Sequence, residues 1–347
     1  SKTDAAYTQM CNMYPQYKHI WDAREAVKSR IEETRAQRLL EGCTTQNTLP
    51  VPLKYYAAHT GRFGGSEKIN LQNLPRGSKL RNALQAGAGQ TLYIADLSNI
   101  EARMLAWLAK EQDLLDSFAL GEDVYSNFAS QIYNKPITKD DKLERYVGKT
   151  AILGLGYGMG ANKYKAILAQ GTPSIDVTQS TALGIVSQYR AMYPNIPQLW
   201  AIGKQLLFYM LDQTSSSYSY GPLQVASNAL KLPNGMYLQY PKLRYSSGEF
   251  VYDSGRTGIT RTHGPRLVEN IIQALARIVI TDQMLAIHKL PEVEVVLTVH
   301  DEIIAIGSDK NADKTLQKIM TIMKQPPSWC AELPLDAEGA HSKIYDK

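Results

Sequence analysis

The 347-residue sequence predicts an α+β protein in which a helical lobe is inserted into a body of strands and helices. Two observations support this fold class. Apolar strand patterns occur just before Asp96 and return after residue 229, whereas helical patterns dominate residues 107 to 215. With 44% hydrophobic and 20% charged residues, the chain can bury a core, and we expect two or more subdomains.

The first part of the chain is helical and reaches an apolar strand only near residue 90. Residues 5 to 40 predict one or two amphipathic helices that end near Gly42, followed by a polar linker through Pro52. The stretch HTGRFGGSEKINLQNLPRG is rich in Gly, Asn and Pro and predicts an ordered loop. In TLYIADLSNIEARMLAWLA, a short strand ends at Asp96 and is followed by a turn and a helix.

Hairpins and one long helix follow the helical insertion. The Asn-Gly pair in KLPNGMYLQY predicts a hairpin turn, and GEFVYDSGRTGITRT predicts a second, polar hairpin. A long helix is expected through GPRLVENIIQALARIVITDQMLAI, with Pro265 near its first turn. A third hairpin is expected at residues 294 to 306, where two β-rich runs flank a His-Asp-Glu tripeptide, and a short helix around residues 310 to 323.

Composition argues against several classes of protein. No run approaches about eighteen apolar residues and the first four residues lead into a polar stretch, so we expect a soluble protein inside a cell, without membrane contact. Cys11, Cys43 and Cys330 are far apart and indicate core thiols rather than disulfides or a zinc site. The net charge of +5 is modest, but Lys and Arg gather in residues 54 to 81 and 139 to 165, as in nucleic-acid binders.

One segment combines cations with an aromatic ring. Arg145, Lys149, Leu153 and Tyr157 recur at steps of four in RYVGKTAILGLGYG, which predicts a stripe along one face of a helix. An isolated pattern of this kind is more typical of a solvated surface helix. The segments around Asp96 and Asp301 favour a functional role for this helix over a solvated surface helix.

Asp96 and Asp301 each close an apolar strand pattern. A single Asp at such a position is most often a turn or helix N-cap residue. Phosphoryl transfer by two divalent ions, however, needs carboxylates from separate parts of a fold, placed so that the metals lie about 3.5–4 Å apart. With the cationic helix, the pair favours metal-assisted phosphoryl chemistry. A histidine-aspartate phosphohydrolase site at His300 is disfavoured, because the six histidines are scattered.

These segments resemble the motifs of family A DNA polymerases, the group of bacterial DNA polymerase I and many phage replicases. DLSNIEAR resembles that family's DYSQIELR, RYVGKTAILGLGYG its finger-helix pattern RxxxKxxxFxxxYG, and TVHDE its QVHDE. TGRFGGSEKINLQNLP is similar to TGRLSSxxPNLQNIP, with one extra residue between Arg62 and Asn70. RLVENIIQALAR resembles the phage-type form of a helix that carries a glutamine, here Gln273. The resemblance covers residues 57 to 346, with the motifs in order.

The resemblance implies a right-hand polymerase fold of the α+β class, with an antiparallel-sheet palm, inserted helical fingers and a thumb that is reduced or missing. The expected divisions are an N-terminal helical segment, or thumb remnant, at 1–56, a first palm part at 57–106, fingers at 107–228 and a second palm part at 229–347. No exonuclease region precedes the motifs in this sequence, so we expect no proofreading. A minimal polymerase and a fragment of a longer replicase both remain open.

The resemblance also implies a metal and nucleotide site. Two Mg²⁺ ions, which Mn²⁺ can replace, would be held by Asp96, Asp301 and the main-chain carbonyl of Leu97. Glu302 matches an auxiliary catalytic acid, and Lys149 matches a catalytic cation. The implied nucleotide-binding residues are Arg145, Lys149, Leu153, Tyr157, Glu101, Leu97, Ser98 and Tyr125.

Individual roles follow from the matching positions. Arg145 and Lys149 match cations that bind the triphosphate, while Tyr157 matches a ring that, with Glu101, closes around the sugar. Glu101 is then the steric gate against a ribose 2′-hydroxyl. Leu153 departs from the family, which usually has Phe or Tyr there. Tyr125 likewise stands where many relatives have a phosphate-binding histidine.

A third group is expected to contact DNA. Arg62 and Gln273 match residues that read the minor-groove side of the primer terminus. Glu269 departs from the Asn of many bacterial relatives. The implied DNA-binding residues are Arg62, Asn70, Gln72, Asn73, Gln273 and His300.

The sequence therefore predicts a DNA-templated DNA polymerase of the phage-like family A type, acting on primer-template DNA and deoxynucleoside triphosphates in phage or viral replication. If phage-encoded, it would work in the cytoplasm of a bacterial host, with replisome partners that the sequence does not identify. A reverse transcriptase or RNA polymerase of the same superfamily is one alternative, although Glu101 argues against the latter. A catalytically weak fragment that binds primed DNA is another.

Overall fold

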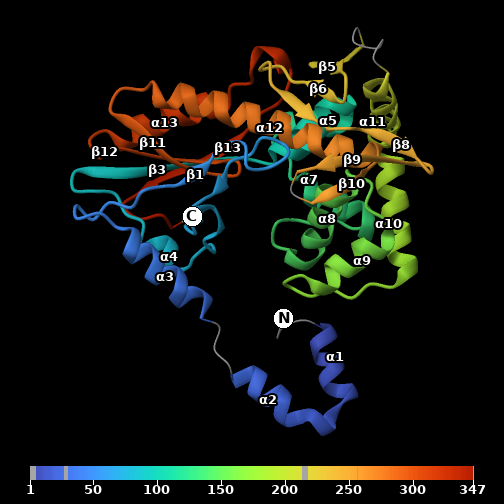
Figure 1. Cartoon of the computed structure of the whole chain (residues 1–347), viewed down its shortest axis with the longest axis horizontal. Helices are drawn as coiled ribbons and strands as arrows, with labels where there is room; N and C mark the ends of the chain where they lie inside the picture. Colours follow the sequence, from blue (N-terminus) through green and yellow to red (C-terminus); the bar gives the residue numbers. More distant parts are fainter. Residues whose placement is uncertain (1–4, 27–29, 213–217, 256, 347) are drawn as a thin grey trace. The chain divides into compact units, whose positions relative to one another are not determined.

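The structure is a computed structural model that describes residues 5–26, 30–212, 218–255 and 257–346 (Figure 1). The chain forms two compact units. The sheet unit comprises Val51–Val124, Gly156–Gly158 and Arg190–Lys347, and the helical unit comprises Ser1–Pro50, Tyr125–Leu155 and Met159–Tyr189. Of the stretch in which helical patterns were expected, residues 107 to 215, only Tyr125–Leu155 and Met159–Tyr189 belong to the helical unit.

Four antiparallel strands form the main sheet, in the order β11-β12-β3-β13 (Figure 1). The apolar run TLYIA builds the central strand β3, in which Tyr93 and Ile94 are almost completely buried. The hairpin expected at residues 294 to 306 is confirmed as β11 and β12. The fourth strand, β13, was not predicted. The strands are β3 (Gln90–Leu97), β11 (Val293–Val299), β12 (Glu302–Ser308) and β13 (Ala337–Ser342).

Helices pack on the main sheet within the sheet unit. The predicted long helix is α12, with Pro265 in its first turn, and it contacts β11 and the shorter helix α13. Among the described residues, α12 alone is long and apolar enough to cross a membrane, but 67% of its most apolar window is buried, as in a core helix. The helices of this unit are α4 (Lys79–Asn82), α5 (Ile100–Ala109), α6 (Gln112–Ala119), α11 (Asn195–Leu211), α12 (Gly264–His288) and α13 (Ala312–Met323), with 3-10 turns η2 (Leu71–Asn73) and η3 (Ser328–Cys330).

The remaining strands form three small antiparallel sheets. The Asn-Gly hairpin is confirmed as β6 and β7, where Gly235 takes a φ of +82°, and the polar hairpin is confirmed as β9 and β10. The predicted ordered loop is also confirmed, apart from the two-residue strand β2 and η2. These strands are β1 (Leu53–Lys54), β2 (Gly64–Gly65), β4 (Ser219–Tyr220), β5 (Leu223–Ala226), β6 (Ala229–Lys231), β7 (Tyr237–Gln239), β8 (Arg244–Ser246), β9 (Glu249–Ser254) and β10 (Gly258–Thr262).

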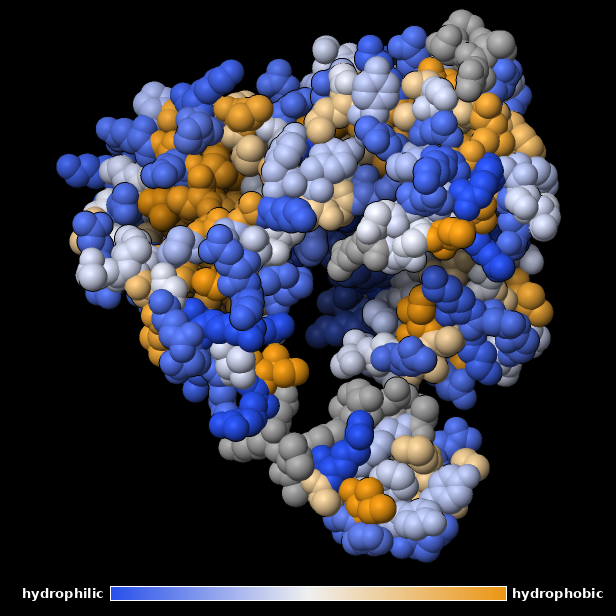
Figure 2. Space-filling model, in the orientation of Figure 1, coloured by the Kyte–Doolittle hydropathy of each residue, from blue (hydrophilic) through white to orange (hydrophobic). Residues whose placement is uncertain are grey.

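The described residues of the N-terminal segment form three α-helices, so the prediction of one or two is wrong. Pro15 ends the first helix, because it lacks an amide hydrogen and instead begins a 3-10 turn. The predicted end at Gly42 is confirmed. Figure 2 shows hydrophilic and hydrophobic side chains interspersed on these helices. They are α1 (Ala5–Met13), η1 (Pro15–Tyr17), α2 (Lys18–Ala26) and α3 (Ile31–Gly42).

Four further helices follow the first part of the sheet unit, and most of their residues belong to the helical unit. They are α7 (Val124–Tyr133), α8 (Lys142–Leu155), α9 (Ala161–Gln170) and α10 (Gln179–Met192). Helices α7 and α8 approach closely at Gly148, where an added Cβ would lie 2.2 Å from the carbonyl oxygen of Tyr125. The two helices can therefore pack at this distance only because residue 148 has no side chain.

Candidate active site

A tight turn carries Asp301 to one end of the main sheet. Val299 pairs with Glu302, which leaves only His300 and Asp301 in the turn between β11 and β12. His300 takes a φ of +55°, in the left-handed region that sharp turns require. The carbonyl of Asp301 accepts a hydrogen bond from the Leu97 N–H at 3.0 Å, which fastens the turn to the end of β3.

Asp96 lies at the same end of the main sheet. It is the penultimate residue of β3 and pairs with Glu302 on one neighbouring strand and Glu338 on the other. The chain then turns at Asn99, whose φ is +55°, and enters α5. The prediction that Asp96 and Asp301 lie where strands end is confirmed.

Other charges crowd the carboxyl group of Asp301. The pKa of Asp301 is raised to about 6, mainly by burial; Arg62 acts to lower it, and Glu101 and Asp96 act to raise it. Arg62 donates a hydrogen bond to the Glu101 carboxylate, and its Nη2 lies 3.7 Å from Asp301 Oδ1. The site thus places Glu101 and Asp301 beside one guanidinium group, with Asp96 acting on Asp301.

This arrangement fits a divalent cation. Asp96 and Asp301 offer hard oxygen ligands, and a bound cation would relieve the repulsion between them. Throughout the described ranges, no group of three or more His, Cys, Asp or Glu residues could by itself hold a metal ion. Mg²⁺ at phosphate-handling sites is usually held by one or two carboxylates, with water and substrate phosphates as further ligands. The two aspartates can supply the protein's share of such a site.

Glu302 is buried beside this site rather than exposed in it. Its carboxylate accepts a hydrogen bond from Arg81 Nη2 at 3.1 Å and another from the Tyr345 hydroxyl. The Arg81 guanidinium also lies over the Tyr345 ring, 3.8 Å from its centroid. These contacts give Glu302 a structural role, and its auxiliary catalytic role stays a prediction.

Three predicted DNA-binding residues line one small cavity. Arg62, Gln72 and His300 border it, together with Arg277 of α12. Gln72 Nε2 donates to the Thr298 carbonyl at 2.9 Å, which ties the loop to β11. Burial lowers the pKa of His300, and Arg62 lowers it further, although Glu101 opposes this effect. Deprotonated His300 can accept a hydrogen bond from a ligand.

The other predicted DNA-binding residues lie outside this cavity. The Asn70 side chain accepts a hydrogen bond from the Gln72 N–H at 3.1 Å and so caps η2, which also carries the exposed Asn73. Gln273 lies on α12, with its Nε2 3.5 Å from Glu269 Oε1. Their roles in DNA binding stay predictions.

Helix α8 of the helical unit carries the predicted triphosphate-binding cations. Arg145 is half-buried, Lys149 is exposed and Leu153 is 40% exposed. Tyr125 of α7 is buried against both cations, because the Arg145 guanidinium carbon lies 5.3 Å and Lys149 Nζ 5.9 Å from its ring centroid. The ring therefore makes a cation–π contact with each of the two cations.

The predicted helical stripe is wrong at its last member. Helix α8 ends at Leu155, and Tyr157 lies in the turn Gly156–Gly158, which belongs to the sheet unit. Glycines at 154, 156 and 158 explain the early end, since Gly158 has a φ of +75°. Trp200 Nε1 donates to the Gly156 carbonyl at 2.8 Å and fastens this turn to α11.

Sequence reasoning gave no role to Arg81, Arg103 or Tyr345, all of which are buried near the site. Arg103 donates to the carbonyl of Ser98, two residues after Asp96. An Arg among apolar residues, as in IEARMLAWLA, could have indicated a buried cation that needs fixed partners.

Two acidic side chains at one end of the main sheet, and separately a cationic helix in the helical unit, are features typical of proteins that carry out metal-assisted phosphoryl or nucleotidyl transfer. The family model described as DNA polymerase family A matches residues 1–205. The chain belongs to this family. The resemblance recognised in the sequence and the expected α+β polymerase fold are thereby confirmed.

Individual relatives agree with this assignment. The chain is 29% identical over 348 residues to a DNA polymerase of Bacillus phage SP02, covering 84% of this chain and 52% of the relative. It is 26% identical over 325 residues to DNA polymerase I of Pseudomonas aeruginosa, covering 92% of this chain and 32% of the relative. The chain thus spans about half or less of these relatives.

A solved structure shares the fold. The POL domain of Pol1 from M. smegmatis, in complex with a DNA primer-template and dNTP, superposes with a TM-score of 0.66 at 22% identity. The match covers 89% of this chain and 50% of that one. At this identity, the similarity shows the fold alone.

Proposed function

We propose that this chain is the polymerase part of a DNA-directed DNA polymerase that extends a primer with deoxynucleotides. The observation that carries the proposal is the convergence of Asp96 and Asp301 at one end of the main sheet, in a member of DNA polymerase family A. Its partners are primer-template DNA and deoxynucleoside triphosphates.

The reaction transfers one nucleotidyl group. The primer 3′-oxygen forms a bond to the α-phosphorus, the bond between the α-phosphorus and the bridging oxygen breaks, and pyrophosphate leaves while the primer hydroxyl loses its proton. Two Mg²⁺ ions held by Asp96, Asp301 and the Leu97 carbonyl would activate the 3′-oxygen and neutralise charge on the phosphates. Arg145 and Lys149 bind and orient the triphosphate, and this positioning lowers the barrier further.

Several residues select the substrate. Glu101, paired with Arg62, excludes a ribose 2′-hydroxyl and so favours deoxynucleotides. Tyr157 and Leu153 contact the sugar and base of the incoming nucleotide. Arg62 and Gln273 contact the minor-groove side of the primer terminus. Gln72 and His300, which line a cavity with Arg62, also bind the DNA.

The proposal extends to the division of the chain into palm and fingers and to its biological role. The palm comprises residues 57–106 and 229–347, and the fingers comprise residues 107–228. The relative from Bacillus phage SP02 supports a role in phage DNA replication, inside a bacterial host.

Primer extension tests the proposal directly. With Mg²⁺, deoxynucleotides and a labelled primer-template, we expect extension by the wild-type chain and a loss of about 100-fold or more in Asp96→Asn and Asp301→Asn. Primed-DNA affinity of both variants should stay within a few-fold of the wild type, because phosphate contacts supply most of that affinity.

Asp176→Asn is the matched control. It removes one carboxylate whose side chain is 88% exposed in the helical unit, and it should leave extension unchanged. DNA binding without any extension by the wild type would support the alternative of a weak DNA-binding fragment. Preferential extension on an RNA template would support a reverse transcriptase.

A further inference from the structure

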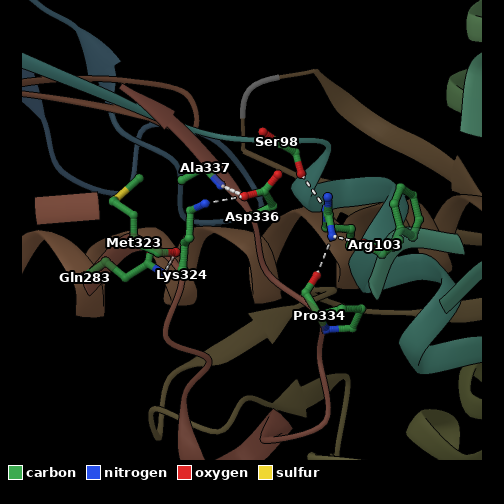
Figure 3. Close-up of polar contacts among 9 residues, drawn as sticks. Ser98, Arg103, Gln283, Met323, Lys324, Pro334, Asp336 and Ala337 are labelled. Carbon is green, nitrogen blue, oxygen red and sulfur yellow. Dashed lines mark hydrogen bonds and ion pairs between the residues drawn. The ribbon is translucent and has the colours of Figure 1, made fainter. Parts of the chain in front are cut away.

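The main chain at Ser98 is held from both sides. Its N–H donates to the carbonyl of Asp336 at 2.8 Å. Its carbonyl accepts from Arg103 Nε at 2.8 Å (Figure 3). Ser98 directly follows Leu97, whose carbonyl is a proposed metal ligand, and it lies two residues after Asp96. A shift at Ser98 would therefore move the metal ligands that precede it.

Arg103, which donates to the Ser98 carbonyl, is itself fixed by several contacts. The side chain is buried, and its Nη1 donates to the carbonyls of Pro334 at 2.8 Å and Phe118 at 3.3 Å. The guanidinium also lies 4.6 Å from the centroid of the Phe118 ring. One planar cation thus joins three chain segments, and the fork geometry of Arg suits this role in a way that a lysine ammonium does not.

The turn needs this support. Asn99 directly precedes α5 with a φ of +55°, in the left-handed region that Asn tolerates better than most residues, and its side chain makes no capping hydrogen bond. The turn that follows the metal ligands is therefore stabilised by its neighbours rather than by its own cap.

The partner segment at Asp336 is itself fixed. Its carboxylate accepts from the Ala337 N–H at 2.9 Å and forms an ion pair with Lys324 at 2.8 Å (Figure 3). Lys324 follows the last residue of α13, Met323, whose carbonyl accepts from buried Gln283 of α12 at 2.8 Å. The contacts that hold Ser98 thus extend back to the core helix α12.

We propose that Arg103 and Asp336 are positioning residues for the metal site, because they hold the main chain at Ser98 and thereby fix the Leu97 carbonyl and the Asp96 carboxylate. The inference rests on the proposed polymerase function for its activity readout. The Mn²⁺ affinity of the protein, in contrast, can be measured without polymerisation.

Arg103→Lys in the full chain tests this role. We expect the concentration of Mn²⁺ at half-saturation, followed through the electron paramagnetic resonance signal of free Mn²⁺ without substrates, to rise about tenfold. The Mg²⁺ requirement for extension should rise in parallel and kcat should fall about tenfold, with primed-DNA affinity within a few-fold.

Leu206→Ala is the control for general loss of stability, since Leu206 is buried in α11 of the same unit. It should lower the unfolding temperature and leave the Mn²⁺ half-saturation unchanged. An Arg103→Lys variant that behaves like this control would overturn the proposal.

If Arg103→Lys does not fold, Asp336→Ala decides the question, because it removes both side-chain contacts, to Ala337 and to Lys324, that fix the Asp336 carbonyl against Ser98. A raised Mn²⁺ half-saturation supports the proposal, and an unchanged one overturns it. A wild type that binds Mn²⁺ but does not extend primers would instead contradict the proposed function.

Discussion

The ring of Tyr125 contacts the two cations of α8, Arg145 and Lys149. We therefore expect Tyr125→Phe to keep the KM for deoxynucleotides within about twofold of the wild type. Tyr125→Leu should raise it about fivefold, which corresponds to about 1 kcal/mol of cation–π interaction. Steady-state kinetics on one primer-template measures both values. Equal impairment of the two variants would show that the hydroxyl matters instead.

Glu101 accepts a hydrogen bond from Arg62, which also lies near Asp301. If its carboxylate fills the space that a 2′-hydroxyl needs, Glu101→Ala should lower the ratio of deoxy- to ribonucleotide incorporation efficiency by about 10-fold or more. Glu101→Gln preserves the size of the side chain and serves as the matched control. An unchanged ratio in Glu101→Ala would mean that the residue acts as an early-helix acid that stabilises α5.

The packing of α7 on α8 depends on the absence of a side chain at residue 148. In Gly148→Ala, the new Cβ meets the Tyr125 carbonyl oxygen at 2.2 Å and Ala129 at 3.0 Å. Because backbone cannot move aside cheaply, we expect a loss of about 1–3 kcal/mol in the free energy of unfolding.

Gly184→Ala in α10 provides the contrast, since an added Cβ there meets no atom within 4 Å. It should be neutral or stabilise the protein by up to about 1 kcal/mol through helix propensity. Denaturant unfolding of both variants measures these differences. A stable Gly148→Ala protein would contradict the close approach of the two helices.

Elements with a strong pattern of their own were predictable from the sequence. The strands around Asp96 and Asp301 and the long helix α12 each bury an apolar run, so local sequence was enough. Strand β13 was missed because its sequence, AEGAHS, is polar and mostly exposed. It is a strand because β3 offers it an unpaired edge, which is a tertiary rather than a local cause.

In the candidate site, too, only the residues that follow from local sequence were predictable. The positions of both aspartates followed from strand ends, but the partners of Glu302 did not, since Arg81 and Tyr345 lie far from it in sequence. Tyr157 was misplaced because periodicity alone extends a helix past the glycines that end it.

Folding and metal binding should be linked across the whole molecule. A cation that binds Asp96 and Asp301 only when they converge stabilises the folded state, by about 2.7 kcal/mol at a concentration 100 times its Kd. We expect Mn²⁺ to raise the unfolding temperature by a few degrees and EDTA to reverse the change. Circular dichroism during heating measures it.

The double variant Asp96→Asn, Asp301→Asn is the reference for this effect. Removing both carboxylates should abolish the response to Mn²⁺, while Asp176→Asn should preserve it. A rise of equal size in the double variant would place the responsible metal elsewhere on the protein.

The strand order of the main sheet also determines when this sheet can form during synthesis of the chain. Both neighbours of β3 come from much later in the chain, since Asp96 pairs with Glu302 and Glu338. At about 5–20 residues per second, the ribosome needs on the order of tens of seconds to supply them. Throughout that interval the apolar strand TLYIA has two unpaired edges, which favours association with other chains. The nascent polypeptide can therefore complete the main sheet only after β12 and β13 have been synthesised.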